Sequence, residues 1–265
     1  MNAPDPQKPI DLRSVKTACG TCSLVQLCLP LGIGKDDMEL LNSIIKRRRP
    51  ISRNGNVFCL GDNFHALFAI RSGSVKTYTI TEDGSEQITG FHLPGEIIGL
   101  DAISSGYHPC GAKALETTSV CEIPFERLEE LAETIPGLGR QLLRIMSREI
   151  QSDEELLTLL GKKSAEERLA TLLLSLAQRY GERGFSFKEF HLSMSRNDIG
   201  NYLGLAVETV SRLFSRFQQQ NLIVVHNKHI CIEHLGHLQA IAGYTGSPPV
   251  VNVDANAGAC VGGKR

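Results

Sequence analysis

The segment from residue 195 to residue 215 constrains the fold of this chain more than any other part of the sequence. Ser195 and Asp198 form a typical helix start, ahead of a short helix whose buried face would carry Ile199 and Leu203. Gly200 leaves room for a second helix that crosses closely, and Gly204 can adopt the left-handed conformation that a tight turn between helices requires. The segment therefore predicts two helices joined by a short turn.

The second helix is expected to begin at about Val207, with a buried face formed by Val210, Leu213 and Phe214. Its exposed side presents three polar residues near the N-terminal end: Glu208, Ser211 and Arg212. Arginine can pair with O6 and N7 of guanine, glutamate can accept from N4 of cytosine, and serine can reach a base or a phosphate. The same spacing also permits a Glu208–Arg212 salt bridge on an ordinary helical hairpin. We favour a DNA-recognition helix, and the β-type run over 222–232 predicts a winged helix-turn-helix.

The charge of the chain is unevenly distributed, although the net charge is only −1. Residues 1–161 hold 16 basic and 21 acidic side chains, whereas residues 162–231 hold 10 basic and 6 acidic ones. This asymmetry is typical of a regulatory domain joined to a nucleic-acid-binding domain. The apolar runs are far shorter than the roughly 20 residues of a membrane span, and the N-terminus has no apolar signal core. We expect a cytoplasmic protein that does not bind membranes.

The remaining sequence divides into regions of different periodicity. Short β-type runs over about 50–124 are punctuated by glycines and predict a small barrel or jelly roll. A helical pattern follows, and Ser164 and Glu167 form a capping box that begins a further domain. The predicted fold class is α+β, with these parts in chain order: a disordered tail (1–17), a cysteine loop plus jelly-roll β-barrel sensor domain (18–135), a long dimerisation helix (136–161), the winged helix-turn-helix domain (162–243) and a second disordered tail (244–265).

The helix expected over 136–161 has the spacing of a coiled-coil seam, formed by Leu143, Met146, Ile150, Asp153, Leu157 and Leu160. One position that should be apolar, Asp153, carries a carboxylate. In a surface helix lying on the barrel, Asp153 would simply face water. We favour a dimerisation helix whose seam is weakened by Asp153, because two buried like charges that face each other oppose association.

The cysteines indicate a metal centre. The chain has eight of them and no secretory signal, so they are expected to be metal ligands or free thiols. Three of them lie within ten residues and form the proposed ligand triplet: Cys19, Cys22 and Cys28. A fourth thiolate must come from a distant position. The candidates for this fourth ligand are Cys59, Cys110 and Cys121. Cys231 is expected to be a core residue, and Cys260 lies in the tail. Four thiolates suit either structural zinc or an iron–sulfur cluster, and the single CxxC favours the cluster.

Taken together, these features strongly resemble the fumarate and nitrate reduction regulators, the oxygen-sensing branch of the cyclic-AMP receptor protein superfamily. The resemblance extends from about Cys19 to Gly243. It is most specific in four segments: Asp83–Phe91 (DGSEQITGF), Cys121–Phe125 (CEIPF), Ala165–Leu169 (AEERL) and Asp198–Gly204 (DIGNYLG).

The resemblance implies an oxygen-responsive global regulator of anaerobic gene expression. It selects Cys121 as the fourth ligand of one [4Fe–4S] cluster per subunit, beside the three N-terminal cysteines. It also implies that the recognition helix reads a TTGAT half-site of an inverted repeat, that RNA polymerase is a partner, and that the cluster-bound protein is a homodimer. Asp153 would keep the cluster-free protein monomeric.

Other functions receive less support from the sequence. The phosphate-binding turn of the nucleotide-binding relative contains an arginine, whereas Tyr107–Ala112 here contains none, so no cyclic nucleotide is expected. An iron–sulfur redox enzyme would need a second cofactor motif, and none is present. We therefore expect a protein that is not an enzyme. A zinc-stabilised or small-molecule-sensing regulator of the same superfamily is the main alternative.

Overall fold

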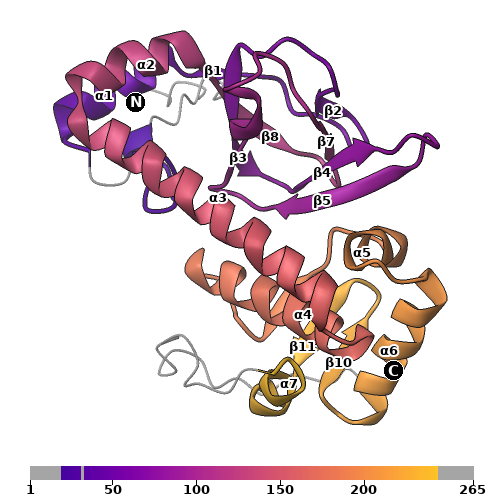
Figure 1. Ribbon diagram of the computed structural model, residues 1–265. Helices are drawn as coiled ribbons and strands as arrows, with labels where there is room; N and C mark the ends of the chain where they lie inside the picture. The colour runs from indigo at the N-terminus through magenta and orange to yellow at the C-terminus, as the bar shows by residue number, and fades with distance from the viewer. Residues whose placement is uncertain (1–18, 31–32, 244–265) are drawn as a thin grey trace, which may run out of the picture.

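The computed structural model describes residues 19–30 and 33–243. The expected tails over 1–17 and 244–265, and Cys260 with them, lie outside these residues. The chain mixes helices and strands, which confirms the α+β class (Figure 1). The elements, in order, are η2 (Cys19–Thr21), α1 (Lys35–Ile44), β1 (Lys46–Arg47), β2 (Asn56–Phe58), β3 (Ala66–Ser72), β4 (Val75–Ile80), β5 (Glu86–His92), β6 (Ile97–Ile98), η3 (Leu100–Ala102), β7 (Gly111–Ala114), β8 (Ser119–Pro124), α2 (Phe125–Thr134), α3 (Pro136–Lys162), α4 (Ala165–Glu182), β9 (Glu189–His191), α5 (Arg196–Leu203), α6 (Val207–Gln219), β10 (Ile223–His226), β11 (His229–Ile232) and α7 (Leu235–Ile241).

The N-terminal strands form two antiparallel four-stranded sheets, in the orders β1-β8-β3-β6 and β2-β7-β4-β5. Apolar side chains from both sheets form one core cluster, which includes Phe58, Phe68 and Val120. The glycines end the strands as expected: Gly73 and Gly84, for example, have positive φ angles of 79° and 81°. The glycine-punctuated region thus forms a double-sheet N-terminal domain.

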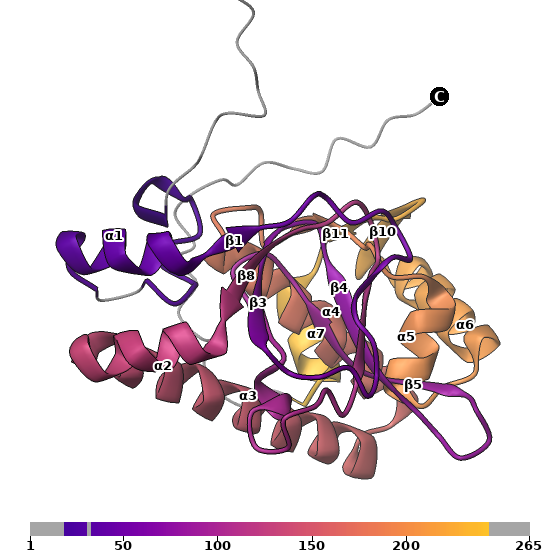
Figure 2. The same ribbon diagram turned by 90° about the horizontal axis from the view of Figure 1, so that it is seen from above.

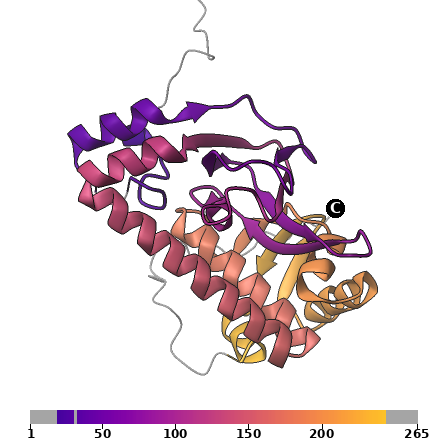
Figure 3. The ribbon, with the colours of Figure 1, turned by 45° about the horizontal axis from the view of Figure 1, so that its top comes forward.

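Helix α3 connects the two ends of the molecule (Figure 3). It begins with Pro136, whose missing N–H is not needed in the first turn of a helix. Its first turns pack with α1 and α2 against one sheet, in a cluster that contains Leu41, Leu128 and Leu138. Its last turns lie beside α4, at the C-terminal domain. No helix in the described ranges is long and apolar enough to cross a membrane.

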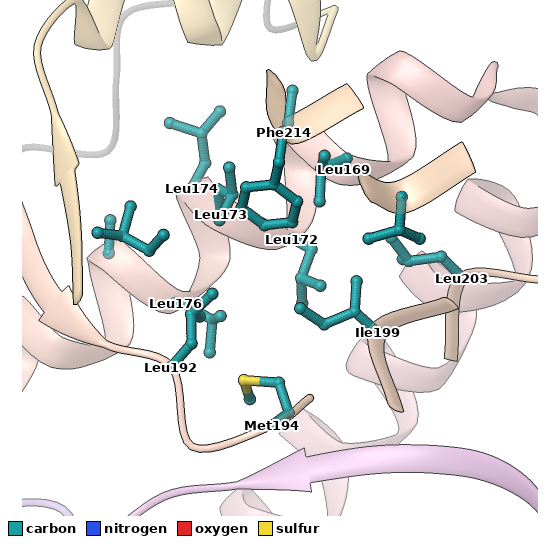
Figure 4. Close-up of a cluster of buried hydrophobic side chains, with 14 of the residues drawn as sticks. Leu169, Leu172, Leu173, Leu174, Leu176, Leu192, Met194, Ile199, Leu203 and Phe214 are labelled. Carbon is teal, nitrogen blue, oxygen red and sulfur yellow. The ribbon is translucent and has the colours of Figure 1, made fainter. Parts of the chain in front are cut away.

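The C-terminal domain is built around α4. The predicted capping box is present, because the Ser164 backbone N–H donates to Glu167 Oε2 at 2.7 Å and the Glu167 N–H donates to Ser164 Oγ at 3.4 Å. Leucines of α4 pack with α5 and α6, and Figure 4 shows Leu169, Leu172 and Leu173 close to Phe214. A three-stranded sheet, β10-β11-β9, completes the domain and includes the predicted wing.

The N-terminal domain and the C-terminal domain are packed together, which the sequence did not indicate. Tyr78, Ile88 and Phe91 of β4 and β5 belong to the same apolar cluster as α4, α5 and α6. Polar contacts join the same elements: Lys76 Nζ lies 2.9 Å from Asp198 Oδ1, and Asn201 Nδ2 donates to the Glu86 carbonyl at 2.6 Å. Helix α5 therefore lies directly beside β5 (Figure 1).

Candidate cysteine cavity and nucleic-acid interface

The three N-terminal cysteines lie in a compact loop. Hydrogen bonds close its turns, from the Cys22 N–H to the Cys19 carbonyl at 3.1 Å and from the Cys28 N–H to the Leu24 carbonyl at 3.1 Å. The Cys19 N–H also donates to Asn42 Oδ1 of α1 at 3.3 Å. The loop is thus folded back on itself and attached to α1, so that its three thiols lie in one place.

Cys121 joins these three thiols around one small cavity. It lies in β8, paired with Arg47 of β1 and Ala69 of β3. The cavity has a volume of about 40 Å³ and an almost entirely apolar lining, whose residues are Cys19, Cys22, Leu24, Val25, Cys28, Leu29, Pro30, Ile45, Ala69, Ile70, Arg71, Gly95, Cys121 and Ile123. The structure therefore brings together the four cysteines that the resemblance implies.

The two other candidates for the fourth ligand lie elsewhere. Cys110 is buried in the core between the two sheets, where its thiol donates to Asp101 Oδ2 at 3.1 Å. Cys59 lies in a turn, where its sulfur accepts a hydrogen bond from Asn56 Nδ2 at 3.2 Å. Neither lines the cysteine cavity. Cys231, expected in the core, is buried in β11.

The environment of the cavity disfavours free thiolates. Burial raises the pKa of Cys19 and Cys121, and it raises the pKa of Cys28 to about 12. Repulsion between the sulfurs contributes to these raised pKa values, whereas Arg47 lowers the pKa values of Cys19 and Cys121. Four thiolates in this apolar space therefore need a positively charged centre among them.

The donor set supplies the four thiolates that a cubane cluster needs. Each of the four irons of such a cluster takes one thiolate, and the cavity brings four cysteines together. A single zinc ion also takes four thiolates, each about 2.3 Å from it. Within residues 19–30 and 33–243, no group of three His, Cys, Asp or Glu side chains that could hold a metal ion was found. The four thiols match the ligand number of either centre.

Helix α3 contacts the cysteine loop directly. Gln141 Nε2 donates to the Cys28 carbonyl at 3.4 Å, and Gln141 is only 1% exposed. Its Oε1 atom is buried without a hydrogen-bond partner among the residues that the structure describes. A buried amide of this kind is sensitive to movement of its neighbours, because losing its remaining bond would leave both of its polar atoms unsatisfied. Gln141 was not identified from the sequence, since only the folded chain brings it next to residue 28.

The predicted helix-turn-helix is present in α5 and α6. The Ser195 side chain accepts from the Asp198 N–H at 3.1 Å and caps α5, and Gly204 has a φ angle of 63° in the turn. A Cβ atom on Gly200 would lie 2.6 Å from the Leu205 carbonyl oxygen, so only glycine allows this close approach. The reason given for Gly204 is therefore confirmed, whereas the closest approach at Gly200 is to the turn, and α6 contacts it only through Val210 Cγ2 at 3.5 Å.

The recognition surface of α6 is exposed. Val210, Leu213 and Phe214 are buried as predicted, whereas Glu208, Ser211 and Arg212 face solvent. Arg212 Nη2 donates to Thr209 Oγ1 at 3.2 Å, and none of the ion pairs found among the described residues joins Glu208 to Arg212. The three side chains are thus available to a ligand.

The polar surface extends farther along α6 than predicted. An open depression is lined by Ser211, Arg212, Ser215, Arg216, Gln219 and Gln220. The additional residues follow Ser211 and Arg212 at intervals of four positions, first as Ser215–Arg216 and then as Gln219–Gln220. Residues four apart lie on the same face of a helix, so this spacing could have identified them from the sequence. Arg216 also pairs with Glu166 of α4 at 3.1 Å. Figure 2 shows α6 at the opposite end of the molecule from α1, where the cysteine loop is attached.

The seam residues of α3 fall into two rows. Leu143, Ile150 and Leu157 are 66%, 60% and 71% exposed, which is unusual for large apolar side chains on one helix. The other row is Met146, Asp153 and Leu160. Asp153 is exposed, while Met146 is half-buried and Leu160 packs against the core of the C-terminal domain. The seam positions thus form an apolar stripe beside a carboxylate.

Comparison with known proteins places the chain in a family. A model of the Crp-like helix-turn-helix domain matches residues 167–241, and a model of the cyclic nucleotide-binding domain matches residues 48–134. The transcriptional activator protein Anr of Pseudomonas protegens is 54% identical over 237 residues, covering 89% of this chain and 97% of that protein. The fumarate and nitrate reduction regulatory protein of Escherichia coli K12 is 51% identical over 227 residues, covering 86% and 91%. The chain belongs to the family of fumarate and nitrate reduction regulators.

Solved structures agree with this assignment. FixK2 from Bradyrhizobium japonicum is 30% identical, with a TM-score of 0.69, and the match covers 75% of this chain and 97% of that one. A CooA mutant from Carboxydothermus hydrogenoformans has a TM-score of 0.62 at 17% identity, which shows a shared fold. The resemblance seen in the sequence is therefore confirmed, and the chain has the two-domain fold of the Crp and fumarate and nitrate reduction regulators.

Proposed function

We propose that this chain is a cytoplasmic, oxygen-responsive global transcription regulator that controls anaerobic gene expression together with RNA polymerase. In this proposal Cys19, Cys22, Cys28 and Cys121 hold one [4Fe–4S] cluster per subunit. The observation that carries it is the convergence of these four cysteines on one apolar cavity, together with the Gln141 bond from the loop to α3. When bound, the cluster supplies an oxygen-reactive iron centre in a space that excludes bulk water.

The protein residues around the cavity convert ligation into a change at α3. The four cysteines fix the loop against β8, and Gln141 connects the Cys28 backbone to α3. An ordered loop therefore holds the first turns of α3 in one position. Once the thiolates are released, the loop can move, and the buried Gln141 amide loses its partner. The two arrangements differ discretely, as a switch requires.

The exposed stripe of α3 is the proposed dimer contact. Pairing two copies along Leu143, Ile150 and Leu157 would remove large apolar side chains from water. The Asp153 carboxylates of the two subunits would then lie near each other and oppose association. The apolar contact and the repulsion between the Asp153 carboxylates thus nearly balance, and an ordered cysteine loop shifts this balance toward the dimer.

DNA binding follows from dimerisation. Two copies of α6 in a symmetric dimer can enter major grooves about one helical turn apart, which matches an inverted repeat. Arg212 is proposed to pair with guanine in a TTGAT half-site, with Glu208 and Ser211 reading neighbouring bases. A monomer presents one helix, so its affinity for the full site is far lower.

Anaerobic purification tests this proposal. We expect a broad visible absorption of iron–sulfur type, four irons per subunit, a dimer in sedimentation and tight binding to a TTGAT inverted repeat. Exposure to air should bleach the absorption, dissociate the dimer and release the DNA. A colourless protein that contains one zinc ion per subunit and binds the same DNA in air would establish the zinc-stabilised alternative instead.

A further inference from the structure

The cysteine loop touches the turn between β5 and β6. Gly95 in this turn lines the cysteine cavity and has a φ angle of 92°. A Cβ atom added to Gly95 would lie only 2.9 Å from Cβ of Leu27, which belongs to the loop between Cys22 and Cys28. Leu27 therefore rests directly on the backbone of the turn, and a shift of the loop removes or changes this contact.

The residue after Gly95 binds two arginines of the C-terminal domain. Glu96 Oε1 accepts from Arg179 Nε at 3.0 Å and from Arg183 Nη2 at 2.5 Å, and Glu96 Oε2 accepts from Arg179 Nη2 at 2.6 Å. The arginines also hold the backbone of the turn region: Arg183 Nε donates to the Pro94 carbonyl at 2.6 Å, and Arg179 Nη2 donates to the Phe91 carbonyl at 2.6 Å. We call the turn Leu93–Glu96 with these two arginines the Glu96 junction.

Helix α4, which contains Arg179 and ends at the C-cap residue Arg183, positions the recognition helix. Its leucines form the core that α5 and α6 share (Figure 4). At the other end of α4, Arg168 Nη1 donates to the Leu203 carbonyl at 2.8 Å and holds the end of α5. A displacement of α4 relative to the sensor domain therefore displaces the whole helix-turn-helix.

The Glu96 junction favours two discrete states. The Arg183 side chain is 2% exposed, so its charge is removed from water and depends on Glu96, on the Pro94 carbonyl of the turn and on the Arg179 carbonyl one helical turn earlier. A buried charge that loses its partner is strongly destabilising. The pairs are consequently either formed or broken, and intermediate separations are disfavoured.

We infer that the Glu96 junction transmits the position of the cysteine loop to the DNA-binding domain within one subunit, as a second route besides dimerisation through α3. The inference rests on the proposed function for the event that moves the loop. Leu27 rests on Gly95 and so fixes the position of the turn. The turn positions Glu96, which binds Arg179 and Arg183. These two arginines fix the orientation of α4 relative to the turn. A dimer with a displaced loop would then hold its recognition helices in the wrong orientation.

The coupling is tested first on the full-length, cluster-free chain. Amide hydrogen exchange is measured in the last turns of α4 for wild type, Leu27→Ala, Arg183→Lys and the double variant. Leu27 and Arg183 share no direct contact, so independent effects would multiply. We expect Leu27→Ala to speed exchange at least threefold when Arg183 is present and to have no effect in Arg183→Lys. An equal effect in both backgrounds overturns the inference.

The second test uses the cluster-loaded protein and the inverted-repeat DNA. Arg183→Lys should retain wild-type iron content and dimer sedimentation, yet bind the DNA about tenfold more weakly. Arg127→Lys is the matched control, because Arg127 forms an exposed ion pair with Glu130 on α2, and its affinity should be unchanged. Wild-type affinity in Arg183→Lys overturns the inference while leaving the proposed function intact. If wild type assembles no cluster, the proposed function fails. The hydrogen-exchange measurement alone then tests whether the Glu96 junction couples the cysteine loop to α4.

Discussion

The cysteine cavity and the recognition helix are assembled in opposite ways. The helix-turn-helix is continuous in sequence, and its functional side chains point outward into solvent. The cavity combines a loop near the N-terminus with Cys121 on a distant strand, and its functional groups are enclosed by apolar side chains. A continuous, exposed site is determined by local geometry. A discontinuous, buried site exists only after the sheets have formed.

This difference determines what a substitution does at each site. In the cavity, removing one thiol removes a ligand that no neighbouring residue can replace, so the loss should be all-or-none. On α6, removing one side chain should subtract one contact from several and leave the helix folded. Helix α3 lies between the two sites, and changes there should alter how strongly they communicate.

The largest expected effect is loss of the cluster in Cys121→Ser. A serine hydroxyl is a poor iron ligand, and the described residues that line the cavity include no fifth cysteine to replace Cys121. Iron and acid-labile sulfide per subunit, measured anaerobically, should fall to background. The matched control is Cys110→Ser, which should retain the cluster because Cys110 lies in the core between the sheets. Retention of the cluster in Cys121→Ser together with its loss in Cys110→Ser would reverse the ligand assignment.

The next effect in size is weakening of the dimer in Ile150→Ala. Ile150 is exposed in the single chain, so its truncation should leave the folded subunit nearly unchanged. If it is buried in the dimer, each lost side chain should cost about 2–5 kcal/mol. Sedimentation of the cluster-loaded protein measures this directly, with Leu40→Ala as a control for another exposed leucine outside the stripe. Equal dimer affinity in both variants would place the dimer contact elsewhere.

A smaller effect is expected at the DNA interface. Arg212→Ala should cost about 1–3 kcal/mol at the guanine of the half-site and relax discrimination there, because a bidentate contact is lost. Binding titrations against half-sites with each base at that position measure this. Gln219→Ala, on the same polar face but farther along α6, should leave the discrimination unchanged. A uniform loss on all sequences would instead identify Arg212 as a phosphate contact.

The two sites also differ in how far the sequence alone predicted them. The helix-turn-helix was predictable residue by residue, since the cap at Ser195, the close approach at Gly200 and the turn at Gly204 are local requirements. Reasoning from the residues left three candidates for the fourth cysteine, because nothing local distinguishes Cys121 from Cys59 or Cys110. The family resemblance was needed to choose, and the strand pairing of β8 then places Cys121 beside the loop.

Contacts between domains were the part that no sequence pattern indicated. Gln141 lies in a helix, Glu96 in a turn and Arg183 just after the end of a helix, and each of these polar residues would ordinarily be assigned to the surface. Each instead makes a buried contact with a residue far away in sequence. Periodicity reports which face of an element is covered, but it cannot report which element covers it.

Asp153→Ala should strengthen dimerisation of the cluster-free protein. Removing like charges that face each other across the seam leaves the apolar stripe to drive association, and we expect an effect of about tenfold, equivalent to about 1.4 kcal/mol. Sedimentation in air compares wild type with Asp153→Ala, and Glu154→Ala removes an adjacent exposed carboxylate as the control. If wild type and Asp153→Ala have the same monomer–dimer equilibrium, Asp153 is merely solvated and does not set the threshold.

The smallest effect concerns Glu149, which lies one turn before Asp153 on α3. Burial, together with repulsion from Asp153, Glu96 and Asp101, raises the pKa of Glu149 to about 7, although Arg179 acts in the opposite direction. The unfolded chain has a Glu pKa of about 4.3. Between these values the folded chain binds more protons, so the free energy of unfolding contributed by this group falls as the pH rises through that interval.

Glu149→Gln should therefore stabilise the cluster-free protein at pH 8 relative to wild type, and have little effect near pH 4.5, where the carboxyl is already protonated in the folded chain. Urea unfolding at several pH values measures the difference, with Glu154→Gln as a control on the same helix. Because Glu149 faces Glu96 and Arg179, the substitution also changes the charge beside the Glu96 junction. If Glu149→Gln and Glu154→Gln show the same pH dependence of the free energy of unfolding, folding does not raise the pKa of Glu149.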